Sequence, residues 1–241
     1  MIRSFLVWTL TWAYMTAAGL ISLPGIWITG RLNFTYAAAR LGLRMLFNLA
    51  GVRIEVQGRE LLPAAAATGA LIYMANHQSN LDPPILVSAL PGNIAFLAKR
   101  QLFSVPILGT MLSVGGLIPV DRAGDRDAAR ATVARAAAAL TAGRPFLVFP
   151  EGTRSRDGSL LEFKKGPFYL AEQAQAPVVP VRVDGSGALM PRGSARIHPG
   201  TVKLTIAAPI LPASWIDAAD PRAALAQQVR QRLAAPPLAL R

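Results

Sequence analysis

The stretch ALIYMANHQSNLDPP, residues 70–84, holds the three parts of an α/β unit in chain order. Residues 70–75 are apolar and long enough for a buried strand. Asn76, Ser79 and Asn80 favour a turn, and the prolines that begin at Pro83 are typical of the first turn of a helix. This pattern places His77, one of only two histidines, in the loop that leaves the strand.

The chain repeats this alternation of strand and helix from residue 52 onward. Strands are expected at residues 52–57, 70–75, 94–98, 117–120, 146–149, 178–183 and 202–207. Helices are expected at residues 83–90, 105–114, 125–142, 166–175 and 221–234. The alternation predicts an α/β fold, a single domain with a mostly parallel or mixed central sheet flanked by helices on both faces. Sheets of this kind carry their chemistry in the loops that leave the strand ends.

The composition limits the chemistry. The chain has no cysteine, which excludes disulfides, a thiolate nucleophile and cysteine-based metal sites. With only two histidines left as imidazole ligands, we expect no metal centre and no cofactor. The net charge of +12 predicts an anionic partner, and nucleic acid, acidic lipid and an acidic carrier protein all fit the charge alone.

The N-terminal region is strongly apolar. Between Arg3 and Arg31 the chain carries no charge, and Pro24 is expected to interrupt this run after about 20 residues, close to the minimum length for crossing a bilayer. The next stretch, residues 31–51, places arginines among aromatic and leucine residues, which is typical of a helix in the headgroup layer. A pair of helices embedded in one leaflet fits both stretches.

We therefore expect residues 1–49 to form a two-helix membrane anchor and residues 50–241 to form the α/β domain. The competing interpretations of the first stretch are a cleaved signal peptide and a helix buried in a soluble core. If the first helix spans the membrane, the arginines that follow it place the rest of the chain on the cytoplasmic side.

His77 and Asp82 form the first candidate site. They are five residues apart, so a continuous helix or strand would point them in different directions, whereas a turn brings them together. The imidazole could then take a proton from a hydroxyl while the carboxylate fixes its tautomer and stabilises the imidazolium. The alternative is that Asp82 only caps the helix and His77 has no catalytic task.

The second candidate site is the loop in FLVFPEGTRSRDGSL, residues 146–160. Backbone N–H groups near Gly152 and the forked guanidinium of Arg154 are suited to a phosphate, and Glu151 could orient that arginine. The alternative is a solvated basic turn. The chain contains neither a Walker glycine pattern nor a G-x-S-x-G elbow, which argues against nucleotide hydrolysis and serine esterase chemistry.

Two further cations follow expected strands. Lys99 comes after the strand at 94–98, and Arg122 comes after the strand at 117–120. Because His77 and Arg154 also follow strands, all four side chains are expected at one edge of the sheet. The alternative for both cations is ordinary surface charge, which Asp121 and Asp125 would neutralise at Arg122.

Four blocks, NHQSNLD, IPVDR, FPEGTRS and VVPVRV, occur in this order between residues 76 and 183. In order and spacing they resemble the glycerolipid acyltransferase family, most closely its bacterial 1-acylglycerol-3-phosphate acyltransferases. The resemblance covers about residues 50–210, and the apolar N-terminal pair of helices is similar to the family's membrane-embedded segment.

The resemblance implies transfer of a fatty acyl group from a thioester, on acyl carrier protein or coenzyme A, to the sn-2 hydroxyl of lysophosphatidic acid. His77 would be the general base and Asp82 its partner. The residues implied in binding the acceptor's phosphate are Lys99, Arg122, Glu151, Gly152, Thr153 and Arg154. N–H groups at the start of the helix after Asp82 are candidates for stabilising the oxyanion on the thioester carbonyl.

The implied partners are anionic membrane lipids and the acyl donor, without nucleic acid or metal. The implied location is the bacterial inner membrane, with the active site facing the cytoplasm. Other readings are the same chemistry on glycerol 3-phosphate or a lyso-aminolipid, and a non-enzymatic protein that binds anionic lipid.

Overall fold

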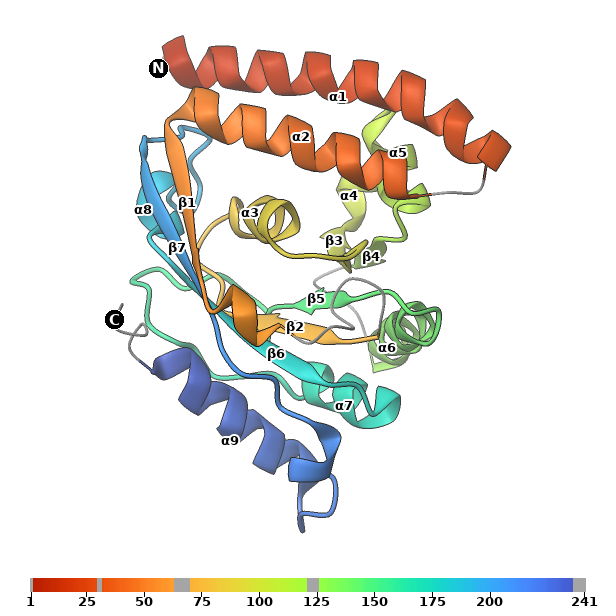
Figure 1. Cartoon of the computed structure of the whole chain (residues 1–241), viewed down its shortest axis with the longest axis vertical. Coiled ribbons are helices and arrows are strands. Elements are labelled where there is room, and N and C mark those ends of the chain that lie inside the picture. Colours follow the sequence, from red (N-terminus) through yellow and green to blue (C-terminus); the bar gives the residue numbers. More distant parts are fainter. Residues whose placement is uncertain (1, 30–31, 63–69, 121–125, 236–241) are drawn as a thin grey trace.

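The computed structural model of the chain describes residues 2–29, 32–62, 70–120 and 126–235. Its centre is a seven-stranded sheet with the order β1-β7-β6-β2-β5-β3-β4 (Figure 1). The strands are β1 (Val52–Gln57), β2 (Ile72–Ala75), β3 (Ala95–Lys99), β4 (Ile118–Val120), β5 (Phe146–Val148), β6 (Val178–Asp184) and β7 (Gly200–Ile206). All neighbouring strands pair in parallel except β6 and β7, which are antiparallel, so the sheet is mixed.

Helices cover both faces of this sheet. They are α1 (Ile2–Thr29), α2 (Asn33–Ala50), α3 (Asp82–Ala89), α4 (Arg100–Phe103), α5 (Leu108–Val114), α6 (Arg126–Thr141), α7 (Lys165–Ala174), α8 (Ser186–Leu189) and α9 (Pro221–Ala234). Two short 3-10 turns are η1 (Arg59–Leu61) and η3 (Pro212–Ser214). In Figure 1, α1, α2 and α3 lie on one side of the sheet, and α7 and α9 lie on the other.

Strand β2 shows why the sheet has two covered faces. Its side chains alternate, so that Tyr73 joins the core beneath α2 and α3, while Ile72 and Met74 join the core beneath α6, α7 and α9. All three side chains are fully buried. The expected mixed α/β sheet with helices on both faces is therefore confirmed.

Most element boundaries lie within two residues of those expected, but α5 begins later than residue 105. The reason is local: Pro106 disfavours helical backbone at the residue before it, and Ile107 has a positive φ of 62°. The chain thus needs a sharp corner between α4 and α5. Gly109 allows this corner, since a Cβ atom at that position would lie 2.0 Å from the Phe103 carbonyl oxygen.

The prediction that Pro24 interrupts the first helix is wrong, because α1 continues as one helix to Thr29. Pro24 is exposed, so its ring lies away from the neighbours on which α1 packs. The stretch Arg3–Ile26 is long and apolar enough to cross a membrane. Only 17% of its most apolar 18 residues are buried inside the protein.

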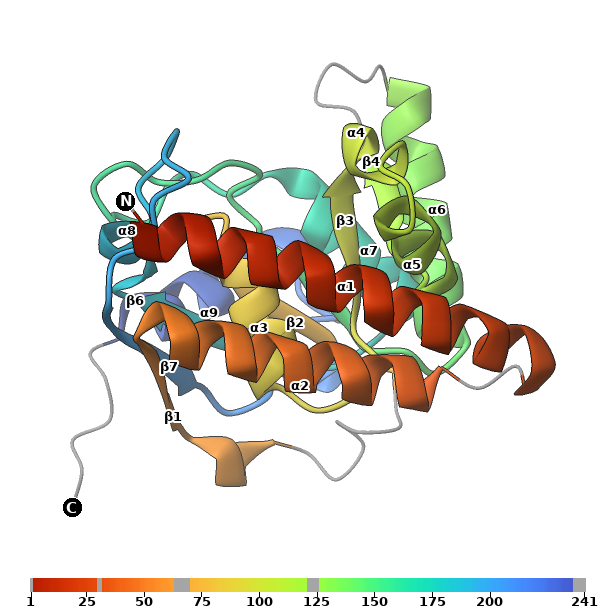
Figure 2. The same cartoon turned by 90° about the horizontal axis from the view of Figure 1, so that it is seen from above.

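Helices α1 and α2 lie side by side and pack closely (Figures 1 and 2). Gly42 permits the close approach: a Cβ atom there would lie 2.1 Å from the Tyr14 ring, and the Tyr14 hydroxyl donates to the Ala38 carbonyl at 2.7 Å. The pair also reaches the body of the protein, since Val7 and Phe47 belong to the same buried cluster as the sheet.

The outer surface of this helix pair is a hydrophobic band. We use this name for its exposed large side chains, which are Phe5, Leu6, Leu10, Trp12, Leu20, Ile21, Ile28, Phe34, Leu41, Met45 and Leu49. Exposed apolar surface of this extent is typical of contact with a membrane or another protein. Embedding of residues 1–49 in a membrane, and the domain boundary after them, stay predictions.

Candidate functional site

His77 and Asp82 are in direct contact. His77 Nδ1 lies 2.7 Å from Asp82 Oδ2, in the loop between β2 and α3. The Asp82 side chain is fully buried, whereas 17% of the His77 side chain is exposed. The pair therefore combines a carboxylate shielded from water with an imidazole that a substrate can reach, and the contact expected from the turn is confirmed.

Asp82 does more than begin a helix. Its Oδ2 atom also accepts hydrogen bonds from the backbone N–H groups of Gln78 and Ser79, at 2.7 and 2.8 Å, and its side chain caps no N–H group of α3. One oxygen atom of Asp82 therefore fixes both the conformation of the loop and the position of the His77 ring.

The prediction that N–H groups at the start of α3 stabilise an oxyanion is wrong. Positions 83 and 84 are both proline and have no N–H group. The backbone N–H of Asp82 donates to the Ser79 carbonyl, and that of Ile85 donates to the Leu81 carbonyl. The first turn of α3 therefore shapes the loop and offers no donor at these positions to a substrate.

The loop after β5 is bonded to both sides of the His77 backbone. The His77 N–H donates to Glu151 Oε1 at 2.9 Å, and the Ser155 N–H donates to the His77 carbonyl at 2.7 Å. The other oxygen of Glu151 accepts from the Leu161 N–H at 2.9 Å. Burial raises the pKa of Glu151, because desolvation outweighs these two N–H groups that stabilise its charge.

Three contacts of the site were not predicted from the sequence. The His77 ring stacks on Phe149, with ring centroids 4.1 Å apart. Asn76 exchanges two hydrogen bonds with the Val183 backbone on β6, at 2.7 and 2.8 Å. Ser79 Oγ donates to the Met190 carbonyl at 2.8 Å. Asn76 and Ser79 are polar residues close to a buried strand, which signals that their side chains need hydrogen-bond partners. Those partners could not be identified from the sequence, because they lie more than 100 residues away.

The remaining candidate residues that the structure describes lie at the same edge of the sheet. Strands β2, β5 and β3 are parallel neighbours, so their carboxyl ends place His77, the 151–154 loop and Lys99 along one edge. Lys99 is exposed and two strands from His77, about 10 Å away by strand spacing. Gly152 has a positive φ of 66° and is exposed, while Thr153 and Arg154 are half-buried. Arg122 lies outside the described residues.

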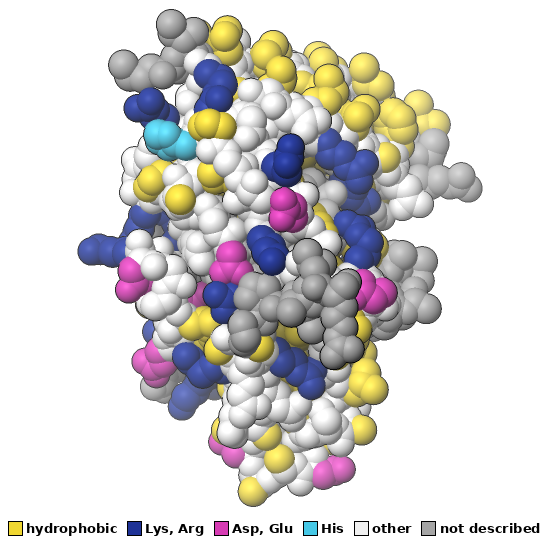
Figure 3. Space-filling model, turned by 60° about the vertical axis from the view of Figure 1, so that its left-hand side comes forward, with side chains coloured by type: hydrophobic (Ala, Val, Ile, Leu, Met, Phe, Trp, Pro, Cys, Tyr) yellow, Lys and Arg dark blue, Asp and Glu magenta, His cyan; other side chains and the backbone are white. Residues whose placement is uncertain are grey.

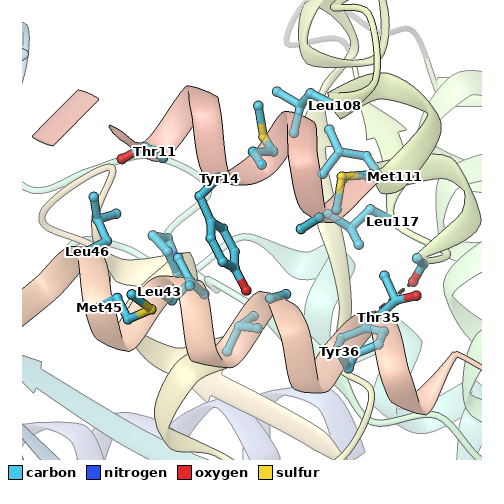
Figure 4. Close-up of a pocket in the computed structure, with 18 of the residues that line it drawn as sticks. Thr11, Tyr14, Thr35, Tyr36, Leu43, Met45, Leu46, Leu108, Met111 and Leu117 are labelled. Carbon is cyan, nitrogen blue, oxygen red and sulfur yellow. Dashed lines mark hydrogen bonds between the residues drawn. The ribbon is translucent and has the colours of Figure 1, made fainter. Parts of the chain in front are cut away.

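An apolar cavity of about 540 Å³ lies between α1, α2, α3, β3 and α5. Figure 4 shows Tyr14 reaching from α1 toward α2, with Leu108, Met111 and Leu117 on the α5 side. Pro84 also lines the cavity, two residues after Asp82, so the cavity extends to the first turn of α3. Its volume falls within the roughly 300–1,000 Å³ usual for ligand pockets.

Comparison with known proteins finds relatives that are named 1-acyl-sn-glycerol-3-phosphate acyltransferases. The chain is 38% identical over 159 residues to the chloroplastic 1-acyl-sn-glycerol-3-phosphate acyltransferase of Arabidopsis thaliana, covering 66% of this chain and 44% of that protein. It is 36% identical over 162 residues to the human 1-acyl-sn-glycerol-3-phosphate acyltransferase alpha, covering 67% of this chain and 56% of that protein. The chain thus spans about half the length of these curated relatives.

The fold is similar to a crystal structure over almost its whole length. The 1-acyl-sn-glycerophosphate (LPA) acyltransferase PlsC from Thermotoga maritima matches with a TM-score of 0.82 and 25% sequence identity, covering 96% of this chain and 93% of that one. A family model described as Acyltransferase matches residues 53–184. This match runs from β1 to the end of β6 and includes both loops around His77, and the chain belongs to the acyltransferase family.

Proposed function

We propose that this protein transfers a fatty acyl group from an acyl thioester to the sn-2 hydroxyl of lysophosphatidic acid, giving phosphatidic acid. The observation that carries the proposal is the 2.7 Å contact of His77 Nδ1 with the buried Asp82 carboxylate. The names of the relatives, which are acyltransferases acting on 1-acylglycerol 3-phosphate, support the choice of acceptor.

The reaction follows from the tautomer of His77. Because Nδ1 faces a carboxylate, it carries the ring proton, and Nε2 is left as the base. Nε2 takes the proton from the acceptor's hydroxyl while the oxygen attacks the thioester carbonyl, forming the new C–O bond. The tetrahedral intermediate collapses with cleavage of the C–S bond, and the leaving thiolate takes the proton from the imidazolium. The acceptor is its own nucleophile, so none is needed from the protein.

The acceptor's phosphate is assigned to the loop after β5. Arg154 supplies a forked guanidinium, Gly152 and Thr153 supply backbone and hydroxyl donors, and Lys99 and Arg122 supply additional positive charge. Glu151 takes a positioning role, since 1% of its surface is exposed and both of its oxygens hold backbone N–H groups.

The apolar cavity is assigned to the transferred acyl chain. The reacting carbonyl must lie near His77, and the cavity extends to Pro84 in the first turn of α3. Its lining is almost entirely apolar, so it binds methylene groups without leaving polar groups unpaired.

Residues 1–49 are assigned to a membrane anchor in the bacterial inner membrane, with residues 50–241 on the cytoplasmic side. The hydrophobic band and the apolar stretch Arg3–Ile26 support this assignment. The acceptor is itself a membrane lipid, whereas coenzyme A and acyl carrier protein donors are soluble.

Purified full-length protein tests the proposal directly. Lysophosphatidic acid, glycerol 3-phosphate and a lyso-aminolipid are each offered with acyl-coenzyme A and with acyl carrier protein, and the acylated product is measured. We expect the highest kcat/KM with lysophosphatidic acid, and the two donor arms identify the thioester that is used. Turnover with another acceptor only would overturn the assignment.

His77→Ala provides the matched control. It removes the base but leaves the Asp82 loop and the helix pair in place, so acyl transfer should be lost while membrane binding is retained. Acyl transfer at the wild-type rate by His77→Ala would exclude His77 as the general base.

A further inference from the structure

A second, basic groove lies beside the edge strand β1. Its volume is about 560 Å³, and it is lined by the end of α2, by β1 and by the end of α3. Arg44, Arg53 and Arg59 contribute guanidinium groups, and Asn48 adds an amide. In Figure 3, which brings forward the side that carries β1 and β7, Lys and Arg side chains lie below the hydrophobic side chains at the top, with Asp and Glu side chains among them.

The arginines of this groove form no salt bridge with the residues that the structure describes. Arg44, Arg53 and Arg59 are all exposed. None of the described residues that line the groove is acidic. The acidic residue between them on β1, Glu55, stands opposite Lys203 in the β1–β7 register.

The groove borders the hydrophobic band. Arg44 precedes Met45, and Asn48 precedes Leu49; the side chains of Met45 and Leu49 are 51% and 52% exposed. If the band enters the hydrocarbon layer, residues next to it lie at the depth of the lipid headgroups. Arginine forks at this depth are suited to phosphate oxygens.

The groove is separate from the reacting centre. Strand β1 stands three places from β2 in the sheet, which corresponds to about 14 Å by strand spacing. Along α3, Ser88 of the groove is six residues from Asp82, or about 9 Å along the helix axis. A phosphate bound in this groove is therefore not the phosphate of a lipid whose hydroxyl is at His77.

We propose that this groove binds the phosphate headgroup of an anionic membrane lipid that is not being acylated. Such a contact sets the depth and tilt of the α/β domain on the membrane and so aims the catalytic edge at the bilayer. The site is independent of the reaction, so the two proposals can fail separately.

The test measures binding of a defined lipid to the full-length protein in a non-ionic detergent. Short-chain phosphatidylglycerol is titrated, and the Kd is compared between wild type and Arg53→Gln/Arg59→Gln. Each basic contact near a membrane corresponds to about fivefold in affinity, so the double variant should bind about 25-fold more weakly. Both side chains are exposed, so the fold should survive.

The control removes the same charge elsewhere. Arg222 and Arg232 lie on α9, on the opposite side of the sheet from α2 (Figure 1). Arg222→Gln/Arg232→Gln should bind like wild type, and so should His77→Ala. Equal weakening in either control would overturn the proposal, because net charge or the catalytic site would then explain the binding. If the glutamine pair does not fold, Arg53→Lys/Arg59→Lys should bind several-fold more weakly through loss of both forks; unchanged binding would overturn the assignment.

Four further ligands identify the source of the phosphate. Short-chain phosphatidylcholine, which has no net charge, should bind more weakly than phosphatidylglycerol, and equal binding would overturn the assignment to an anionic lipid. Full competition by inorganic phosphate or coenzyme A at equal concentration would assign the groove to a soluble phosphate. Loss of acyl carrier protein binding in the glutamine pair, with phosphatidylglycerol binding unchanged, would assign it to the carrier.

Discussion

At the scale of single residues, the site depends on a few side chains that each hold more than one group. Asp82 Oδ2 serves His77 and two backbone N–H groups, and Glu151 joins the His77 loop to residue 161. Removing one such side chain affects position and charge together. The informative substitutions therefore keep the shape of the side chain and change one property.

Arg154→Lys keeps the charge and removes the fork. If Arg154 binds the acceptor's phosphate, the KM for lysophosphatidic acid should rise about tenfold, since one charge-assisted hydrogen bond contributes about 1.5–3 kcal/mol. The KM for the acyl donor should change less. Steady-state kinetics with each substrate varied in turn measure both values, and equal increases would remove Arg154 from the phosphate site.

Glu151→Gln tests the effect of burying a carboxyl group. Its pKa is raised on folding, so the folded state binds the proton more tightly. The resulting stabilisation is complete below the unfolded pKa near 4.5 and is lost as the pH rises through the folded pKa. The unfolding free energy of wild type minus that of Glu151→Gln should therefore fall as the pH rises above 4.5.

Thermal unfolding of both proteins in detergent over a pH series measures this difference. Glutamine cannot lose a proton, and the other groups titrate in both proteins, so the difference isolates residue 151. A difference that grows with pH would mean that the two N–H donors outweigh burial.

The sequence predicted part of the site at this scale. The His77–Asp82 contact was predictable because a short polar turn links both residues. The positioning role of Glu151 and the ring of Phe149 beneath His77 were not, because they depend on how two loops far apart in the chain meet. The roles in substrate binding stay predictions.

At the scale of elements, the cavity lies where four helices, α1, α2, α3 and α5, meet β3. The sequence predicted these helices, but not the cavity, because its volume depends on the late start of α5 and on the close approach of α1 and α2 at Gly42. Local signals describe one segment at a time, and packing between segments decides the space that remains.

Ala39→Leu should shorten the acyl chain that the protein prefers. Ala39 lines the cavity from α2, and a larger side chain takes volume that the last methylene groups would occupy. Each methylene excluded from an apolar site costs about 0.8 kcal/mol, so long donors should lose kcat/KM and shorter donors should not. Ala37→Leu, on the exposed side of the same helix, should leave the profile unchanged. A profile unchanged in Ala39→Leu would place the chain elsewhere.

At the scale of the whole molecule, the N-terminal helix pair has two separable contributions. Its outer side chains form the hydrophobic band, while its inner side chains, including Val7 and Phe47, complete the core over the sheet. The sequence predicted the apolar character of residues 1–49 but not this packing, since a run of apolar residues does not show which side faces a protein.

Deleting residues 1–49 should therefore destabilise the α/β domain, giving insoluble protein. By contrast, replacing Phe5, Leu20, Ile21 and Phe34 with Ser changes side chains that are at least 62% exposed, and should weaken vesicle binding with the fold retained. Flotation with vesicles and circular dichroism measure the two effects. A soluble, folded truncation would contradict the contribution of the helix pair to the core.

Strand β7 runs opposite in direction to β2 and β6, because it pairs with β6 in the antiparallel sense. Strand β7 starts beside the catalytic edge and runs away from it, so the segment that follows leaves at the far end of the sheet. Residues 217–220 in that segment are exposed. A fluorescent reporter inserted there would remain clear of both substrates, which makes this segment a suitable attachment point for following the protein during turnover.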